Sequence, residues 1–245
     1  MRYAKSGALA SRPIENRPRL KTCPTRTQCV RHVMKSWFFR LTDRFRRRRM
    51  LRFAHTLCIT RETRVLDVGG TMDYWRLLPD PPRVTLLNTL MAWETLRLVP
   101  GWVAGDGCAL PFRDRSFDVV FSNSVIEHVG DRENQERFAR EVARVGRRYW
   151  VQTPNRWFPI EQHLLMPAIH WLPRRWQRAL APRWHAVHTV LRLTPDQREF
   201  YIRHYLRDIR LLDAAALRTL FPDARLIRER FCGWTKSLVA YRALQ

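Results

Sequence analysis

The sequence predicts an α/β fold: a mostly parallel seven-stranded sheet in a three-layer sandwich, with an antiparallel hairpin at its C-terminal end. Two observations predict it. Between residues 61 and 155, apolar runs of strand length alternate with helical stretches, which implies a parallel sheet covered by helices on both faces. After residue 220, two further strand-like runs follow one another closely. The length of 245 residues suits one such domain with appendages.

Each element follows from its own pattern. Apolar runs predict five strands, at 64–68, 84–87, 102–104, 117–122 and 148–152. Residues 133–145 have helical spacing, with Phe138, Val142 and Val145 along one face. Residues 213–220 predict a short helix, and 224–230 with 237–242 predict the terminal hairpin within 211–245. The segment 156–210 is rich in tryptophan and arginine, and we interpret it either as helices packed on the sheet or as a substrate-covering insertion.

The N-terminal region divides in two. Residues 1–34 carry prolines and basic residues with little apolar periodicity, so we expect this basic segment to be disordered. Residues 35–58 have helical spacing, interrupted by the basic run 46–49. This predicted N-terminal helix either docks on the core with a solvated basic face or lies on an anionic membrane as an amphipathic helix. The cofactor-binding core would then occupy 61–155.

The charge of the chain is strongly positive. The formal net charge is +23, and residues 1–64 alone hold 18 Lys and Arg against three acids. Such an excess is typical of proteins that bind nucleic acid or anionic lipid. Only four of the basic residues are lysines, however, and so lopsided a use of arginine also reflects GC-rich codons. The charge alone therefore neither establishes nor excludes binding to nucleic acid or to anionic lipid.

The cysteines and the hydropathy limit the class of protein. The five cysteines form no C-x-x-C pair and are odd in number, which argues against a disulfide scaffold and against a zinc site, so we expect no metal. The sequence contains no run of 18 apolar residues, so it predicts no transmembrane helix. We expect a cytoplasmic protein, with peripheral membrane contact as the alternative.

Polar residues stand at the ends of the predicted strands. Because ligands of parallel α/β sheets bind at the carboxyl ends of the strands, these residues share one rim; they are Asp67, Asn88, Asp106, Ser122 and Asn123. The first turn holds only Gly69-Gly70 and then Asp73, which would repel a pyrophosphate, so NAD and ATP are disfavoured.

A cofactor with an adenosine but no phosphate suits this rim. An acid near the first turn can meet an ammonium group, a polar residue after the second strand can bond both ribose hydroxyls, and an acid after the third can accept from the adenine amine. Asp67, Asn88 and Asp106 stand in these three places.

Three runs carry a resemblance to a known family. Residues 65–70 read VLDVGG, residues 105–120 fit the pattern D-x-x-x-LPF-x-D-x-SFD-x-V, and residues 122–129 read SNSVIEHV. In these runs the chain resembles the class I S-adenosylmethionine-dependent methyltransferases, in particular the type 11 group. The resemblance covers about 60–160, and the segment 153–161 resembles members associated with glycan or glycolipid pathways.

The resemblance implies a Rossmann-like fold and S-adenosyl-L-methionine as the cofactor. The implied cofactor-binding residues are Asp67, Gly69, Gly70, Asn88, Asp106, Gly107 and Asn123. Two departures stand out: the glycine motif would place glycines at 71 and 73, where Thr71 and Asp73 stand, and Asn88 replaces the usual acid.

A hydroxyl acceptor needs a base to take its proton. The candidates are His128 and His163, the latter with Glu161; a sulfur or carbanion acceptor would need neither. We expect methyl transfer to a small-molecule acceptor, such as a saccharide or a lipid-linked intermediate. Two alternatives remain open: a nucleic-acid-directed methyltransferase, and a non-catalytic protein of this fold that binds a membrane or partner through its basic helix. The oligomeric state is not predicted.

Overall fold

The computed structural model describes residues 43–89, 101–184, 186 and 193–243. The predicted disordered segment 1–34 and the first part of the predicted N-terminal helix lie outside these residues.

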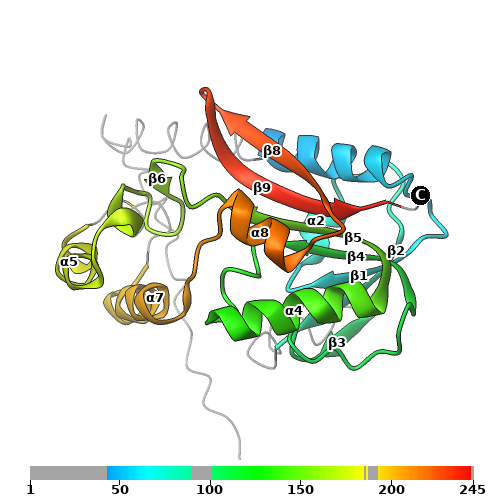
Figure 1. Ribbon diagram of the computed structural model, residues 1–245, viewed down its shortest axis with the longest axis horizontal. Coiled ribbons are helices and arrows are strands. Elements are labelled where there is room, and N and C mark those ends of the chain that lie inside the picture. Colours follow the sequence, from blue (N-terminus) through cyan, green and yellow to red (C-terminus); the bar gives the residue numbers. More distant parts are fainter. Residues whose placement is uncertain (1–42, 90–100, 185, 187–192, 244–245) are drawn as a thin grey trace, which may run out of the picture. The chain divides into compact units, whose positions relative to one another are not determined.

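The core is a seven-stranded sheet in the order β3-β2-β1-β4-β5-β9-β8 (Figure 1). Its strands are β1 (Arg64–Val68), β2 (Arg83–Asn88), β3 (Trp102–Ala104), β4 (Phe117–Asn123), β5 (Gly146–Pro154), β8 (Arg225–Phe231) and β9 (Trp234–Arg242). Strands β1 to β5 pair in parallel, whereas β9 runs antiparallel to both β5 and β8. The predicted mostly parallel sheet with an antiparallel C-terminal hairpin is confirmed.

One face of the sheet is covered by α4 (Arg132–Val145) and α8 (Ala214–Leu220), which Figure 1 shows in front of the strands. Helix α4 begins at Asp131, whose carboxylate accepts from the backbone N–H of Asn134 and so caps the helix. Phe138 and Val142 are fully buried against alternate residues of the central strands, as the helical spacing predicts.

The opposite face is covered by a helix at residues 43–56 and by the short α2 (Met72–Trp75). The ring of Phe53 makes edge contacts with Phe121 at 4.9 Å, Trp150 at 5.7 Å and Trp75 at 5.9 Å between centroids. Met50 and Phe53 are fully buried. Within the described residues, the apolar face of the predicted N-terminal helix therefore docks on the core, which makes the third layer of the sandwich.

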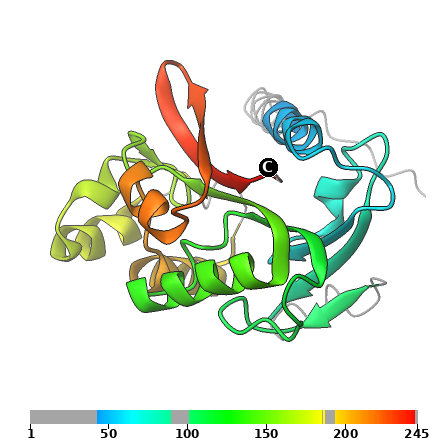
Figure 2. The same ribbon diagram turned by 45° about the vertical axis from the view of Figure 1, so that its right-hand side comes forward.

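The segment between β5 and α8 forms a cap with its own small core (Figure 2). Its elements are β6 (Ile160–Glu161), β7 (Met166–Pro167), η2 (Ile169–Trp171), α5 (Arg174–Leu180), η3 (Ala181–Arg183) and α7 (Pro195–Asp208). Helix α7 begins with a capping box between Thr194 and Gln197. None of the helices in the described part of the chain is long and apolar enough to cross a bilayer.

Candidate functional site

A cavity of about 370 Å³ opens at the carboxyl ends of β1 to β4. It lies where the strand order reverses between β1 and β4, which is the usual ligand position in such sheets. Gly69, Asn88, Asp106 and His128 are at its wall, together with Val68 and other apolar residues. A volume of this size suits a small organic cofactor.

The first turn after β1 requires its two glycines. Gly69 has φ +79°, and a Cβ there would lie 2.5 Å from the Cγ2 atom of Val125. A Cβ on Gly70 would lie 1.8 Å from the Oδ2 atom of Asp67, so Gly70 lies directly over this carboxylate. Because only glycine tolerates both demands, the turn keeps the backbone close to the cavity although positions 71 and 73 carry side chains.

Asp67 lies under this turn rather than in the cavity wall. Its carboxylate is buried, its Oδ2 atom accepts a 2.8 Å hydrogen bond from the indole of Trp75, and its Oδ1 atom has no partner among the described residues. Burial raises the pKa of Asp67 to about 7, against the opposing effect of the Trp75 hydrogen bond. Its place shows Asp67 supporting the turn; direct contact with a cofactor stays a prediction.

Asn88 and Asp106 do reach the cavity, as predicted. The amide of Asn88 donates a 2.8 Å hydrogen bond to the carbonyl of Gly70, while the Oδ1 atom of Asp106 accepts from the backbone N–H of Cys108 at 2.9 Å. Each side chain holds a loop with one atom, which leaves the amide oxygen of Asn88 and the second carboxylate oxygen of Asp106 available for a ligand. Gly107 also lines the cavity, and a Cβ there would lie 2.9 Å from the ring of Phe138.

The two polar residues at the end of β4 do not line the cavity. The Oδ1 atom of Asn123 accepts a 2.6 Å hydrogen bond from Arg49, and its amide donates to the hydroxyl of Tyr74 at 3.1 Å. Ser122 is fully buried, and its hydroxyl has no partner among the described residues. Cofactor contact by Asn123 stays a prediction. Nothing in the sequence distinguishes Arg49 from the other arginines of the run 46–49.

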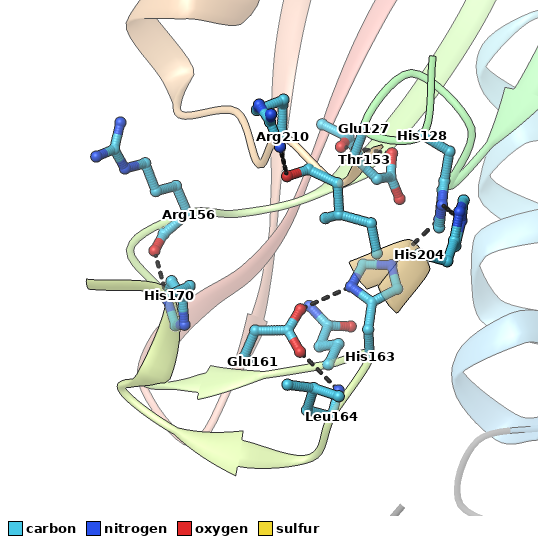
Figure 3. A network of polar contacts seen from close by, with 12 residues as sticks. Glu127, His128, Thr153, Arg156, Glu161, His163, Leu164, His170, His204 and Arg210 are labelled. Atoms are coloured by element: carbon cyan, nitrogen blue, oxygen red, sulfur yellow. Dashed lines mark hydrogen bonds and ion pairs between the residues drawn. The ribbon is translucent and has the colours of Figure 1, made fainter. Parts of the chain in front are cut away.

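The two predicted base candidates meet in a histidine cluster of His128, His163 and His204 (Figure 3). The Nε2 atoms of His128 and His163 are 3.2 Å apart, and the Nδ1 atom of His128 is 3.3 Å from the Nε2 atom of His204. The Nδ1 atom of His163 lies 2.6 Å from Glu161, and that of His204 lies 2.7 Å from Asp208. His128 belongs to both the cluster and the cavity wall, and the cluster therefore joins the cavity to the cap.

His204 belongs to the cluster although no sequence motif marks it. The only signal for it is the spacing of His204 and Asp208, which places both on one face of a helix. Nothing in the sequence indicates that this face of α7 meets the loop after β4.

Burial sets the protonation of this region. Burial lowers the pKa of His128 to about 4, and the charges of His163 and His204 add to this effect, so His128 is neutral near pH 7. Burial also lowers the pKa of His163, but the hydrogen bond and charge of Glu161 outweigh it, and the pKa is raised. Burial raises the pKa of Glu127 to about 7, against the charge of His163.

Comparisons with known proteins agree with the motifs. Residues 76–148 match the family model described as a methyltransferase domain, of the type 11 group. Over 86 residues the chain is 37% identical to a candidate methyltransferase of Encephalitozoon cuniculi; this match covers 35% of the chain and only 41% of that relative.

Solved structures show weaker likeness. A candidate zinc-dependent alcohol dehydrogenase from Rhodobacter sphaeroides aligns with 75% of the chain and 84% of its own, at 12% identity and a TM-score of 0.48. An S-adenosylmethionine-dependent methyltransferase from Methanosarcina mazei aligns with 79% of the chain and 98% of its own, at 15% identity and a TM-score of 0.43. At such scores neither carries an argument about function. The matching family model and the motifs agree: residues 76–148 are similar to the methyltransferase domain of the type 11 group.

Proposed function

We propose that this protein transfers a methyl group from S-adenosylmethionine to a small-molecule acceptor, such as a saccharide or a lipid-linked intermediate. The observation that carries the proposal is the cavity at the strand ends, which has Asn88 and Asp106 on its wall and His128 where it meets the cap.

The residues present fit the cofactor. The Oδ1 atom of Asn88 can accept from ribose hydroxyls, and the free oxygen of Asp106 can accept from the adenine amine. Gly69 brings the backbone of the first turn to the cavity edge. The cofactor brings an already activated methyl group, so the chain has mainly to hold the acceptor in line with it.

A second cavity, of about 460 Å³, offers a place for the acceptor. Trp171 and Tyr205 line it together with Arg156, Arg174 and Arg210, and none of these arginines has a carboxylate partner among the described residues. Arginines bind phosphate and carboxylate groups bidentately, and aromatic rings pack on apolar faces. The lining therefore suits a small acceptor that carries an anionic group.

One residue of each cavity contacts His163 of the histidine cluster: Tyr205 of the second cavity and His128 of the first. The ring of Tyr205 is 6.5 Å from that of His163, which in turn contacts His128. In the reaction, the acceptor oxygen forms a bond to the methyl carbon as the carbon–sulfur bond breaks, and the sulfonium becomes a neutral thioether. An acceptor hydroxyl also loses its proton, and we place the support for this loss in the cluster, where His128 and His163 are the base candidates.

Calorimetric titration with S-adenosylhomocysteine tests the cofactor site. We expect micromolar binding by the parent and loss of binding in Asp106→Ala. Asp114→Ala removes the same side chain at an exposed position outside the cavity and should bind as the parent does. Absence of binding by a folded parent would overturn the proposal.

Isotope transfer from labelled S-adenosylmethionine then identifies the acceptor class. We expect label in saccharide or lipid-linked fractions. Label in RNA, with binding that weakens steeply with salt, would instead show a nucleic-acid-directed enzyme. The end of β4 and the two residues after it read Ser122-Asn123-Ser124-Val125 and have no aromatic platform for a flipped base, which favours the small-molecule acceptor.

A further inference from the structure

Three neutral histidine rings supply three N–H groups, but the cluster has four polar contacts, so one contact lacks a hydrogen. A neutral imidazole carries a single N–H. His163 directs its Nδ1–H to Glu161 and His204 directs its own to Asp208, which leaves a lone pair on the Nε2 atom of each ring. The one N–H of His128 can then serve His204. In this arrangement of protons the two Nε2 atoms of His128 and His163 are 3.2 Å apart with a lone pair on each, and either a proton or a metal ion would satisfy this contact.

This separation is that of two ligands on one metal ion. Nitrogen ligands about 2.0–2.1 Å from a tetrahedral metal lie about 3.3 Å apart. With a metal ion between the Nε2 atoms, three neutral histidines satisfy every contact in the cluster. Without it, one ring has to carry a second proton.

Glu127 supplies a third ligand. One carboxylate oxygen of Glu127 and one ring nitrogen each of His128 and His163 lie within 4.8 Å of one another. Glu127 is fully buried; its Oε2 atom accepts from the hydroxyl of Thr153, and its Oε1 atom has no partner among the described residues. A buried carboxylate oxygen without a partner is costly, and a cation would relieve this cost.

The surroundings complete the pattern of a metal site. Histidine ligands in proteins donate their second N–H to a carboxylate, carbonyl or other acceptor, which orients the ring. Here Glu161 orients His163, His204 orients His128, and Thr153 orients Glu127 (Figure 3). Each of the three candidate ligands is therefore oriented by a hydrogen bond to a side chain that is not itself a ligand.

We propose that Glu127, His128 and His163 bind a divalent transition-metal ion such as Zn²⁺, contrary to the absence of a metal site expected from the cysteines. Two imidazoles and one carboxylate are a known zinc ligand set, and they leave the fourth position open. His128 also lines the cofactor cavity, so an ion held by this side chain would lie beside that cavity. A hydroxyl bound there would lose its proton to water more readily, because the metal charge stabilises the alkoxide. This last step rests on the proposed function, whereas metal binding does not.

The test is a titration of the chelator-treated full-length chain with Zn²⁺, and with Co²⁺ for its visible spectrum. We expect one ion per chain and a tetrahedral Co²⁺ spectrum. His163→Ala and Glu127→Gln should each weaken binding at least tenfold, and His204→Ala should weaken it about tenfold through the loss of orientation. Mg²⁺ should not compete, because it prefers oxygen ligands.

His170→Ala is the matched control. His170 lies in the same cap, but its ring contacts the backbone carbonyl of Arg156 instead of the cluster, so this variant should bind as the parent does. Cys58→Ser with Cys232→Ser removes the thiols that are exposed in the described part of the chain and should also leave binding unchanged.

Two results would overturn the proposal: a folded parent that binds no ion, or binding that survives in both His163→Ala and Glu127→Gln with unchanged spectrum. If the folded parent binds no ion, an extra proton lies between His128 and His163, and this pair remains the candidate base. Titration with S-adenosylhomocysteine, run in parallel, separates this failure from that of the proposed function, because the ligands of the ion and the atoms that bind adenosine are different.

Discussion

Asn88 at the end of β2 donates its side-chain amide to the carbonyl oxygen of Gly70 at 2.8 Å, and this bond ties the first turn of the cofactor site to the neighbouring strand. A carboxylate cannot donate such a bond. The amide of Asn88 therefore holds the turn in a way that the acid expected at this position from the family resemblance could not.

From this we predict that Asn88→Asp weakens the binding of S-adenosylhomocysteine about tenfold, although it introduces the residue usual in the family. The variant loses a hydrogen bond and places a carboxylate against a carbonyl, which together cost about 1–2 kcal/mol. Calorimetry measures the change. Asn134→Asp is the matched control, because it adds the same charge to the cavity wall without cutting a tie to the turn. Equal losses in both variants would show a purely electrostatic effect and refute this role of Asn88.

Asp67 predicts a pH-dependent stability. Its pKa, about 7 in the folded protein and near 3.8 in the unfolded chain, means that the folded state holds the proton more tightly. The stability of the fold should therefore fall as the pH rises from about 4 to 7. Asp67→Asn removes this penalty and keeps an acceptor for Trp75, so its gain in unfolding free energy should be about 2 to 3 kcal/mol larger at pH 8 than at pH 5. Urea denaturation of the cofactor-free protein measures it, and a gain independent of pH would contradict the burial of an ionisable Asp67.

Arg49 and Glu229 form a largely buried ion pair between the helix at 43–56 and β8, with hydrogen bonds of 2.9 and 3.1 Å from Nε. Arg49→Gln should lower the unfolding free energy by about 2 to 3 kcal/mol, because Glu229 is left without its partner. The double variant with Glu229→Gln should cost less than the two single changes together. The exposed pair Arg61–Asp80 is the comparison, and its coupling should be much smaller because water screens both charges. A coupling of Arg49 with Glu229 no larger than this would refute the buried pair.

Phe53 should be the main anchor of the helix at 43–56. Phe53→Ala removes a fully buried ring in contact with Phe121 and two tryptophans, and should cost about 3 to 5 kcal/mol of unfolding free energy. Leu51→Ala changes a neighbouring side chain that is 36% exposed and should cost less than about 1 kcal/mol. Denaturant unfolding of both variants measures the difference. Similar costs would mean that the helix is not docked through this face.

Local pattern predicted the elements of this fold well. The strand at 64–68 was located at its observed bounds, because a strand buried on both faces reads as a short apolar run between turn residues. The strand at 102–104 and the hairpin strands were also found, although β3 and β8 are partly exposed. The glycines of the first turn were also informative, because a backbone φ of +79° favours glycine and so can be predicted from a single residue, Gly69. Asn88 and Asp106 reach the cavity because parallel strands end on one rim.

Contacts between distant segments were not accessible in this way. Periodicity gave two readings for 35–58, and only the packing of Phe53 on β4 and β5 decides between them for the described part. Asn123 was expected at the cofactor, yet Arg49, 74 residues away in the sequence, holds its side chain.

The sequence by itself determined the sheet, the first turn and the strand-end residues, since each depends on neighbours within a few positions. The tertiary structure decided what these residues contact. It placed Asp67 under Gly70, and it brought His204 of the cap to His128 beside the cavity. The physical reason is that hydrophobic periodicity records which face of an element is buried but not which partner covers it, whereas a cluster of ionisable side chains is defined by its partners.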